Sequence, residues 1–467
     1  MMLTAEKEQK KRLKYTVIGV TVMILLITGY SLHKPLPEGF TVTKWDRAVM
    51  HVVEPALRVA YYYPSRMFSK ASNMVYWTRG ALNILSKTLG LLVDTQGQID
   101  IKWHEWNGTP VKVYRPIDNR TSTDGAVIFI HGGGFALGNV EMYDSLVERM
   151  AHEMKTLFIS IEYRLSPETI FPGGILDCEA AIDYFFDNAS SQFGVNTSKI
   201  VIMGDSAGGN LATVIAQRRA AHNASPALAG QVLIYPLLQM ADMQTISYRY
   251  FHSRLSGYAL VDPESVAYYY MFYAGIDMDE KAYLIPSVIS NGHVAKDLKP
   301  EVEEMMSHRI VIESTRNYRN HSISERWEIE RNFEAQDLMR PFLTNPDFSP
   351  LMRKDLSNLP PTMVLTCEFD ILNNGHSTGQ SCRGRPIDFF SQYLVNFARI
   401  SDLVKSRPGP RTQDPGPRTQ DPGPRTQDPG PRTQDPGPRT QDPGPRTQDP
   451  GIPSPCSPLW VWNPDKK

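Results

Sequence analysis

The stretch Gly204-Asp205-Ser206-Ala207-Gly208-Gly209 and an earlier turn, His131-Gly132-Gly133-Gly134, decide the fold of this chain. Each stretch directly follows a run of apolar, often β-branched residues, 199–203 for the first and 126–130 for the second. Such runs indicate buried strands of a parallel sheet, and the residues from Asn210 to Ala220 are predicted to be helical. The chain is therefore expected to pass from a strand through a tight turn into a helix at Ser206.

Ser206 has the surroundings of a catalytic nucleophile. Gly204 and Gly208 stand two residues before and two residues after it. The turn needs them because a Cβ at either position would clash with the neighbouring strand and helix. Such a turn holds the serine hydroxyl at a helix N-terminus, where the backbone amide of Ala207 faces a developing oxyanion. A helix-capping serine is the alternative for Ser206 considered alone.

The earlier turn supplies further amide donors. Gly133 and Gly134 have no side chain, so a substrate carbonyl can approach their N–H groups. With Ala207 they form the predicted oxyanion hole. His131 is expected to shape its turn, because the catalytic histidine of such a hydrolase follows the acid in chain order. The two turns together predict an acyl hydrolase with Ser206 as its nucleophile.

The composition is that of a folded protein without a strong charge bias. Apolar residues make up 41% of the 467 residues, which supports a sizeable core. The formal net charge of -1 argues against nucleic acid as the main partner. The length fits two or three domains, or one large α/β domain with a cap. None of the four cysteines lies in a Cys-x-x-Cys pair, so neither a metal site nor a cofactor is predicted, and one disulfide stays open.

A membrane anchor is predicted near the N-terminus. A basic segment, residues 1–14, precedes an uncharged run over 15–32 that is long enough to span a bilayer. The positive flank keeps the N-terminus cytoplasmic and sends the rest of the chain across the membrane. A cleaved signal peptide is the alternative, although Thr28-Gly29-Tyr30 is a poor cleavage site. A buried core helix is the third interpretation.

Six Asn-x-Ser/Thr sequons follow the predicted anchor and none precedes it, in agreement with a lumenal, glycosylated domain. Chance occurrence is the alternative. The candidate asparagines are Asn107, Asn119, Asn188, Asn196, Asn223 and Asn320.

Periodicity divides the middle of the chain. Residues 33–98 carry apolar positions at helical spacing and are predicted to form a helical cap or linker. Residues 99–375 alternate strands and helices, which is typical of a parallel sheet, with a more polar insertion at about 240–345. A late strand over 362–367 leads into Glu368-Phe369-Asp370. Because a hydrolase sheet presents its acid at the carboxyl end of such a strand, Asp370 is the predicted triad acid; a loop carboxylate is the alternative.

The C-terminal part, 408–467, is predicted to be disordered. From Pro408 to Asp449 the chain repeats Pro-Gly-Pro-Arg-Thr-Gln-Asp six times. Each copy has two prolines without amide donors and no other apolar residue, so neither helix nor sheet is expected. The identical copies indicate an expanded tandem DNA repeat; an extended ligand segment is the alternative.

With these motifs the chain resembles the hormone-sensitive-lipase group of α/β-hydrolases, and within it the arylacetamide deacetylase and neutral cholesterol ester hydrolase family. Three further stretches carry the resemblance: Glu162-Tyr163-Arg164-Leu165-Ser166-Pro167-Glu168, then 345–350, then 359–372. The resemblance implies an α/β-hydrolase fold, a mostly parallel sheet with helices on both faces and a helical cap. It implies a single-pass type II protein of the endoplasmic reticulum membrane. Its lumenal domain would act on apolar carboxylic esters or arylamides.

The family pattern is lost after Gly375, before the catalytic histidine. The only histidine after Asp370 is His376, six positions on, and a base so close would need the acid loop to fold back on itself. The usual last strand and last helix of the domain are expected to be missing. Residues 376–407 include an apolar-faced run over 387–404 that resembles nothing in the family.

Three interpretations therefore stand, because losing a triad member costs several orders of magnitude in rate. The first is a membrane-anchored serine ester hydrolase by descent, its C-terminal sequence coming from a misread or alternative exon. The second is a catalytically inactive ligand-binding protein, resembling the plant gibberellin receptors. The third is an unstable product that does not persist.

Overall fold

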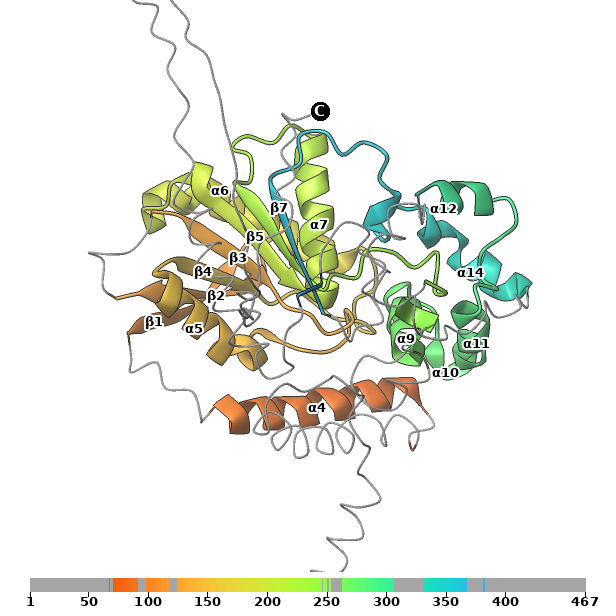
Figure 1. The fold of residues 1–467 in the computed structure, drawn as a ribbon. Helices are drawn as coiled ribbons and strands as arrows, with labels where there is room; N and C mark the ends of the chain where they lie inside the picture. The colour runs from red at the N-terminus through yellow and green to blue at the C-terminus, as the bar shows by residue number, and fades with distance from the viewer. Residues whose placement is uncertain are drawn as a thin grey trace, which may run out of the picture. The chain divides into compact units, whose positions relative to one another are not determined.

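The computed structural model describes residues 67, 70–90, 98–117, 124–245, 247–249, 252, 263–305, 331–367 and 381–382. Within these residues, eight strands form one sheet in the order β1-β2-β4-β3-β5-β6-β7-β8 (Figure 1). The strands are β1 Ile99–Trp106, β2 Thr109–Pro116, β3 Ala126–Ile130, β4 Leu157–Ile161, β5 Ile200–Asp205, β6 Gly230–Ile234, β7 Thr362–Cys367 and β8 Ser381–Cys382.

Strand direction brings the two glycine-rich turns to one edge of the sheet. β1 and β2 form an antiparallel hairpin, and β2 pairs antiparallel with β4. The remaining neighbours, from β4 to β8, pair parallel. In the β3–β5 pair Ile130 lies opposite Gly204, so both strands end at the same level. Open α/β sheets bind their ligands at this carboxyl edge.

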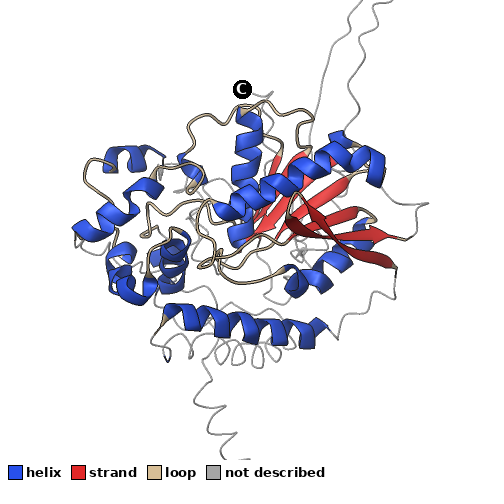
Figure 2. Ribbon diagram, turned by 180° about the vertical axis from the view of Figure 1, so that it is seen from behind, coloured by secondary structure: helices blue, strands red, loops and turns tan. Residues whose placement is uncertain are grey.

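Helices cover both faces of the sheet because its central strands are apolar on both sides. Val127 and Phe129 of β3 belong to a core shared with α5 Asp144–Met154. Ile128 and Ile130 belong to the opposite core, shared with α6 Gly173–Phe193 and α7 Ser206–Ala221. The views in Figures 1 and 2 show these helices on the two sides of the sheet.

Further helices surround this core. The helix α4 Ala71–Gly90 precedes the sheet and falls within the segment predicted as a helical cap or linker. Further helices lie within the predicted insertion, where they gather beside the sheet in Figure 1. They are α9 Pro263–Tyr273, α10 Met278–Lys281, α11 Ile285–Ile289, α12 Lys299–Met305 and α14 Phe333–Leu343. The 3-10 turns are η2 Val140–Tyr143, η3 Thr197–Lys199, η4 Ala282–Leu284 and η6 Pro350–Met352.

Strand β6 ends at Ile234, because Tyr235 has a φ of 34° and Pro236 has no amide donor. The last-strand position, expected to be missing, holds the two-residue β8, in which Ser381 pairs with Thr366 of β7. The predicted tail, 408–467, lies outside the described residues.

Candidate active site

Ser206 lies in a strained turn between β5 and α7. Its φ is 52°, in the left-handed region that non-glycine residues rarely adopt. A Cβ on Gly204 would lie 2.3 Å from the Gly208 oxygen, and one on Gly208 would lie 2.1 Å from the Ile130 oxygen. Both contacts are with backbone oxygens, which could move aside only if the strand or the helix shifted. Glycine at these two positions is therefore what permits the turn.

Asp205 ties this turn to the earlier one. The Gly132 amide donates to Asp205 Oδ1 over 2.8 Å, and the Tyr143 hydroxyl donates to Asp205 Oδ2 over 2.9 Å. Asp205, the residue before the predicted nucleophile, thus holds the first glycine of the oxyanion turn, His131–Gly134. Sequence reasoning did not identify either partner. The carboxylate beside Ser206 was visible in the motif, but nothing in the sequence marked Tyr143.

The predicted oxyanion donors remain open to a ligand. Gly133 has a φ of 122° and Gly134 a φ of 61°. Among the described residues, no acceptor bonds their amide N–H groups. Gly133, Gly134 and Ser206 are partly exposed, whereas the residues around them are buried. Ala207 is the second residue of α7, where a helix leaves its amide without an intrahelical partner.

His131, the first residue of the earlier glycine-rich turn, is buried. Its Nδ1 lies 2.8 Å from the Gly132 oxygen, and its ring stacks on Tyr163 with 4.5 Å between ring centroids. Burial lowers the pKa of His131 to about 4, so the ring is neutral near pH 7. This placement agrees with a shaping role for His131.

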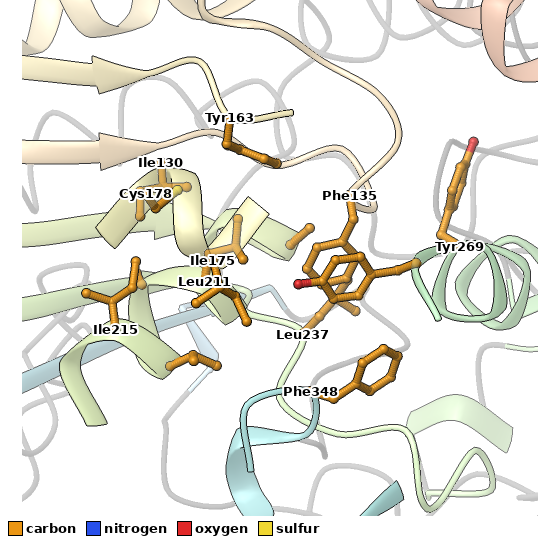
Figure 3. Close-up of a cluster of buried hydrophobic side chains, with 14 of the residues drawn as sticks. Ile130, Phe135, Tyr163, Ile175, Cys178, Leu211, Ile215, Leu237, Tyr269 and Phe348 are labelled. Carbon is orange, nitrogen blue, oxygen red and sulfur yellow. The ribbon is translucent and has the colours of Figure 1, made fainter. Parts of the chain in front are cut away.

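Aromatic side chains of α9 close over the oxyanion turn. The Tyr269 ring lies so near Gly134 that a Cβ there would come within 2.7 Å of Tyr269 Cγ. Phe135 stacks face to face on Tyr273, with ring centroids 3.8 Å apart. Phe348 joins the same cluster (Figure 3). An aromatic cluster of Phe135, Tyr273 and Phe348 thus packs beside the turn that carries Gly133 and Gly134.

The other predicted site residues are placed only in part. Asp370 and His376, like Asn119 and Asn320, lie outside the described residues. Asn107, Asn196 and Asn223 are exposed, whereas Asn188 is half-buried within α6 and donates to the Tyr184 carbonyl over 2.8 Å.

The described residues contain no group of three or more His, Cys, Asp or Glu side chains placed to hold a metal ion. No helix among them is both long and apolar enough to cross a membrane, and the predicted span over 15–32 lies outside them.

The environment of Asp205 predicts a pH dependence of stability. Burial raises the pKa of this carboxyl to about 6, although the hydrogen bonds from Tyr143 and Gly132 oppose the shift. A carboxyl with a pKa raised on folding binds its proton more tightly in the native state. Its contribution is fully present below the ordinary pKa of 3.8 and is lost as the pH rises through about 6.

Asp205→Asn is expected to remove this dependence. Relative to the variant, the parent chain should lose about 3 kcal/mol of unfolding free energy between about pH 4 and about pH 7. Urea unfolding at a series of pH values measures the difference. A difference between the two proteins that stays constant over this range would contradict the assignment.

Comparison with known proteins identifies a family model and several relatives that resemble this chain. A family model described as alpha/beta hydrolase fold matches residues 127–302. The chain is 31% identical to neutral cholesterol ester hydrolase 1 of Rattus norvegicus over 75% of this chain and 84% of that protein. It is 30% identical to arylacetamide deacetylase-like 3 of Mus musculus over 57% of this chain, a match that spans 62% of the mouse protein, less than two thirds of its length.

A solved structure agrees with the fold. The Francisella virulence factor BioJ superposes with a TM-score of 0.51 at 19% identity, over 71% of this chain and 93% of that protein. The glycine-rich turns that meet at Ser206 lie at the carboxyl edge of the same kind of sheet. The chain therefore belongs to the arylacetamide deacetylase and neutral cholesterol ester hydrolase family of α/β-hydrolases.

Proposed function

We propose that this chain is a serine ester hydrolase for apolar carboxylic esters or arylamides. Its turnover is slow because the sequence offers no recognised catalytic histidine after Asp370. One observation carries the proposal: the Gly132 amide bonds Asp205 over 2.8 Å, which joins the turn bearing the open amides of Gly133 and Gly134 to the nucleophile Ser206. The relatives named neutral cholesterol ester hydrolase and arylacetamide deacetylase support the substrate class.

The chemistry follows from this arrangement. Ser206 Oγ attacks the acyl carbon, and the carbonyl oxygen becomes an oxyanion that accepts hydrogen bonds from Gly133, Gly134 and Ala207. The C–O or C–N bond then breaks as the oxyanion collapses, the leaving group takes up a proton, and the acyl group stays on Ser206. Water then attacks this acyl-enzyme, which releases the carboxylic acid and restores the Ser206 hydroxyl. In an intact triad a histidine, oriented by the acid, removes the serine proton and delivers it to the leaving group. Without it, proton removal falls to solvent, and the attack is slow.

Labelling with a fluorophosphonate tests this function. We expect Ser206 to react at least about 1,000-fold more slowly than the nucleophile of the rat relative, because an unassisted serine is a weak nucleophile. Ser206→Ala should abolish the residual labelling, measured as a time course on the full chain in microsomes. Fast labelling would contradict a missing base, and His376→Ala would then show whether His376 supplies it.

A ligand-binding protein without turnover is the second candidate. Its supporting observation is that His376 is the sole histidine after Asp370. Complete absence of Ser206 labelling, with retained binding of an apolar ester by the Ser206→Ala variant, would favour this candidate over the hydrolase.

For the location of the protein, we propose a type II anchor at 15–32 in the endoplasmic reticulum membrane with the hydrolase domain in the lumen. The basic flank and the sequons placed after the span support it. We expect carbonate-resistant membrane association, protease protection in intact microsomes, and a mobility shift after glycosidase treatment. Release by carbonate, or digestion in sealed microsomes, would contradict the anchor or its orientation.

A further inference from the structure

The Arg79 side chain reaches from α4 into the backbone around the oxyanion turn. Its Nε donates to the Ala136 oxygen over 2.7 Å, and its Nη2 donates to the Ser166 oxygen over 2.6 Å. The same guanidinium binds both carboxylate oxygens of Glu168, at 2.6 and 3.0 Å. Only 22% of the Arg79 side chain is exposed, so its fork replaces water as the donor to two main-chain carbonyls.

A relay of planar peptide units leads from Arg79 to the substrate oxygen. The Ala136 oxygen and the Leu137 amide belong to one peptide unit, and the Leu137 amide donates to the Gly133 oxygen over 2.7 Å. The Gly133 oxygen and the Gly134 amide belong to the next unit in the relay and point in opposite directions. Fixing the Ala136 oxygen therefore fixes the direction of the Gly134 N–H.

The Phe135 carbonyl, which precedes that of Ala136 in the chain, is hydrogen-bonded as well. The Phe135 oxygen accepts the Ser166 amide over 2.9 Å, and the Ser166 oxygen is the second carbonyl bound by Arg79. The Ala136 amide also donates to the Gly133 oxygen, over 3.1 Å. The carbonyls of Gly133, Phe135 and Ala136 thus all have partners, whereas no acceptor among the described residues bonds the amides of Gly133 and Gly134.

We propose that Arg79 is a positioning residue that orients the Gly134 amide of the oxyanion hole. The inference rests on the proposed function, because the orientation of this amide matters to a reaction only if Ser206 attacks an ester. Preorganised donors accelerate the reaction because they need no reorientation when the oxyanion forms. Arg79 acts through the peptide relay.

The competing role for Arg79 is to attach α4 through its ion pair with Glu168. The Glu168 side chain is 46% exposed, and ion pairs at such a surface contribute little to stability. The same helix offers a matched control, since Lys87 pairs with Glu141 over 3.0 Å with both side chains largely exposed. An attachment role predicts similar effects from breaking either ion pair, whereas the relay predicts an effect of Arg79 alone.

The test compares Arg79→Met, Arg79→Lys, Glu168→Gln and Lys87→Met in the full chain. Arg79→Met should lower the first-order rate of Ser206 phosphonylation about 10- to 100-fold and leave the reversible affinity for the fluorophosphonate within about twofold. Arg79→Lys keeps the positive charge but lacks the planar fork, so it should melt close to the parent and still label at the low rate. Glu168→Gln and Lys87→Met should label within about threefold of the parent.

Hydrogen–deuterium exchange provides a readout that does not need activity. In Arg79→Met and Arg79→Lys, peptides covering 132–138 should exchange at least about 10-fold faster, because the peptide unit of Ala136 and Leu137 is no longer fixed and the Leu137 amide is held less firmly to the Gly133 oxygen. Peptides of β5 and α7 should be unchanged. Unaltered exchange over 132–138, or equal loss of labelling in Lys87→Met, would overturn the proposal. A parent chain without Ser206 labelling would refute the hydrolase, while the exchange data would still decide the role of Arg79.

Discussion

Replacing residues 376–467 by the corresponding C-terminal segment of rat neutral cholesterol ester hydrolase 1 is expected to raise ester hydrolysis at least about 1,000-fold. The resemblance to this family implies a catalytic histidine in that segment. The replacement should bring an imidazole within reach of Ser206 and Asp370 and add a full-length strand beside β7. Hydrolysis of p-nitrophenyl acetate and butyrate by microsomes measures the gain.

Deleting the repeats alone, 408–449, is the matched control for this exchange. They contain no catalytic group and no apolar residue except proline, so their removal should leave activity within about twofold of the parent. Ser206→Ala in the exchanged protein should return the rate to background. Equal, Ser206-dependent hydrolysis by the parent, the exchange and the deletion would mean that an unrecognised base already serves Ser206.

The parts of this site that were predictable from the sequence are those with local causes. Strands β3 and β5 were predictable because continuous runs of apolar, β-branched residues favour buried parallel strands. The turn at Ser206 was predictable because Gly204 and Gly208 are spaced for it, and the structure shows backbone atoms within 2.3 Å of a Cβ at either position. The sequence signal for each of these residues lies within a few positions along the chain, although the contact behind Gly208 is with the Ile130 oxygen of a distant strand.

Contacts between distant residues could not be predicted in the same way. Tyr143 reaches Asp205 across 62 positions, and Arg79 reaches Ala136 across 57. Neither pair leaves a periodic or spacing signal, since each depends on how η2 and α4 pack on the finished sheet. The insertion behaved similarly: the Tyr269 ring lies against Gly134, yet nothing in the sequence of the insertion indicated which of its residues would contact that glycine.

The physical necessity of the turn leads to a second large effect, from Gly208→Ala. A Cβ at position 208 would lie 2.1 Å from the Ile130 oxygen and 2.5 Å from the His131 oxygen. Both atoms are backbone at the end of β3, so α7 and β3 would have to separate and the Ser206 turn would open. We expect a loss of about 4 kcal/mol or more in unfolding free energy, together with loss of Ser206 labelling.

Gly80→Ala is the matched control for Gly208→Ala, because it adds the same methyl group where a Cβ would meet nothing within 4 Å. Gly80 lies inside α4, where alanine favours the helix, so this variant should gain about 0.5 to 1 kcal/mol. Urea unfolding of the detergent-extracted full chain measures both variants. A Gly208→Ala protein within about 1 kcal/mol of the parent would show that α7 can shift from β3 at little cost, and the packing of the two turns would then not be what holds Ser206 in its strained conformation.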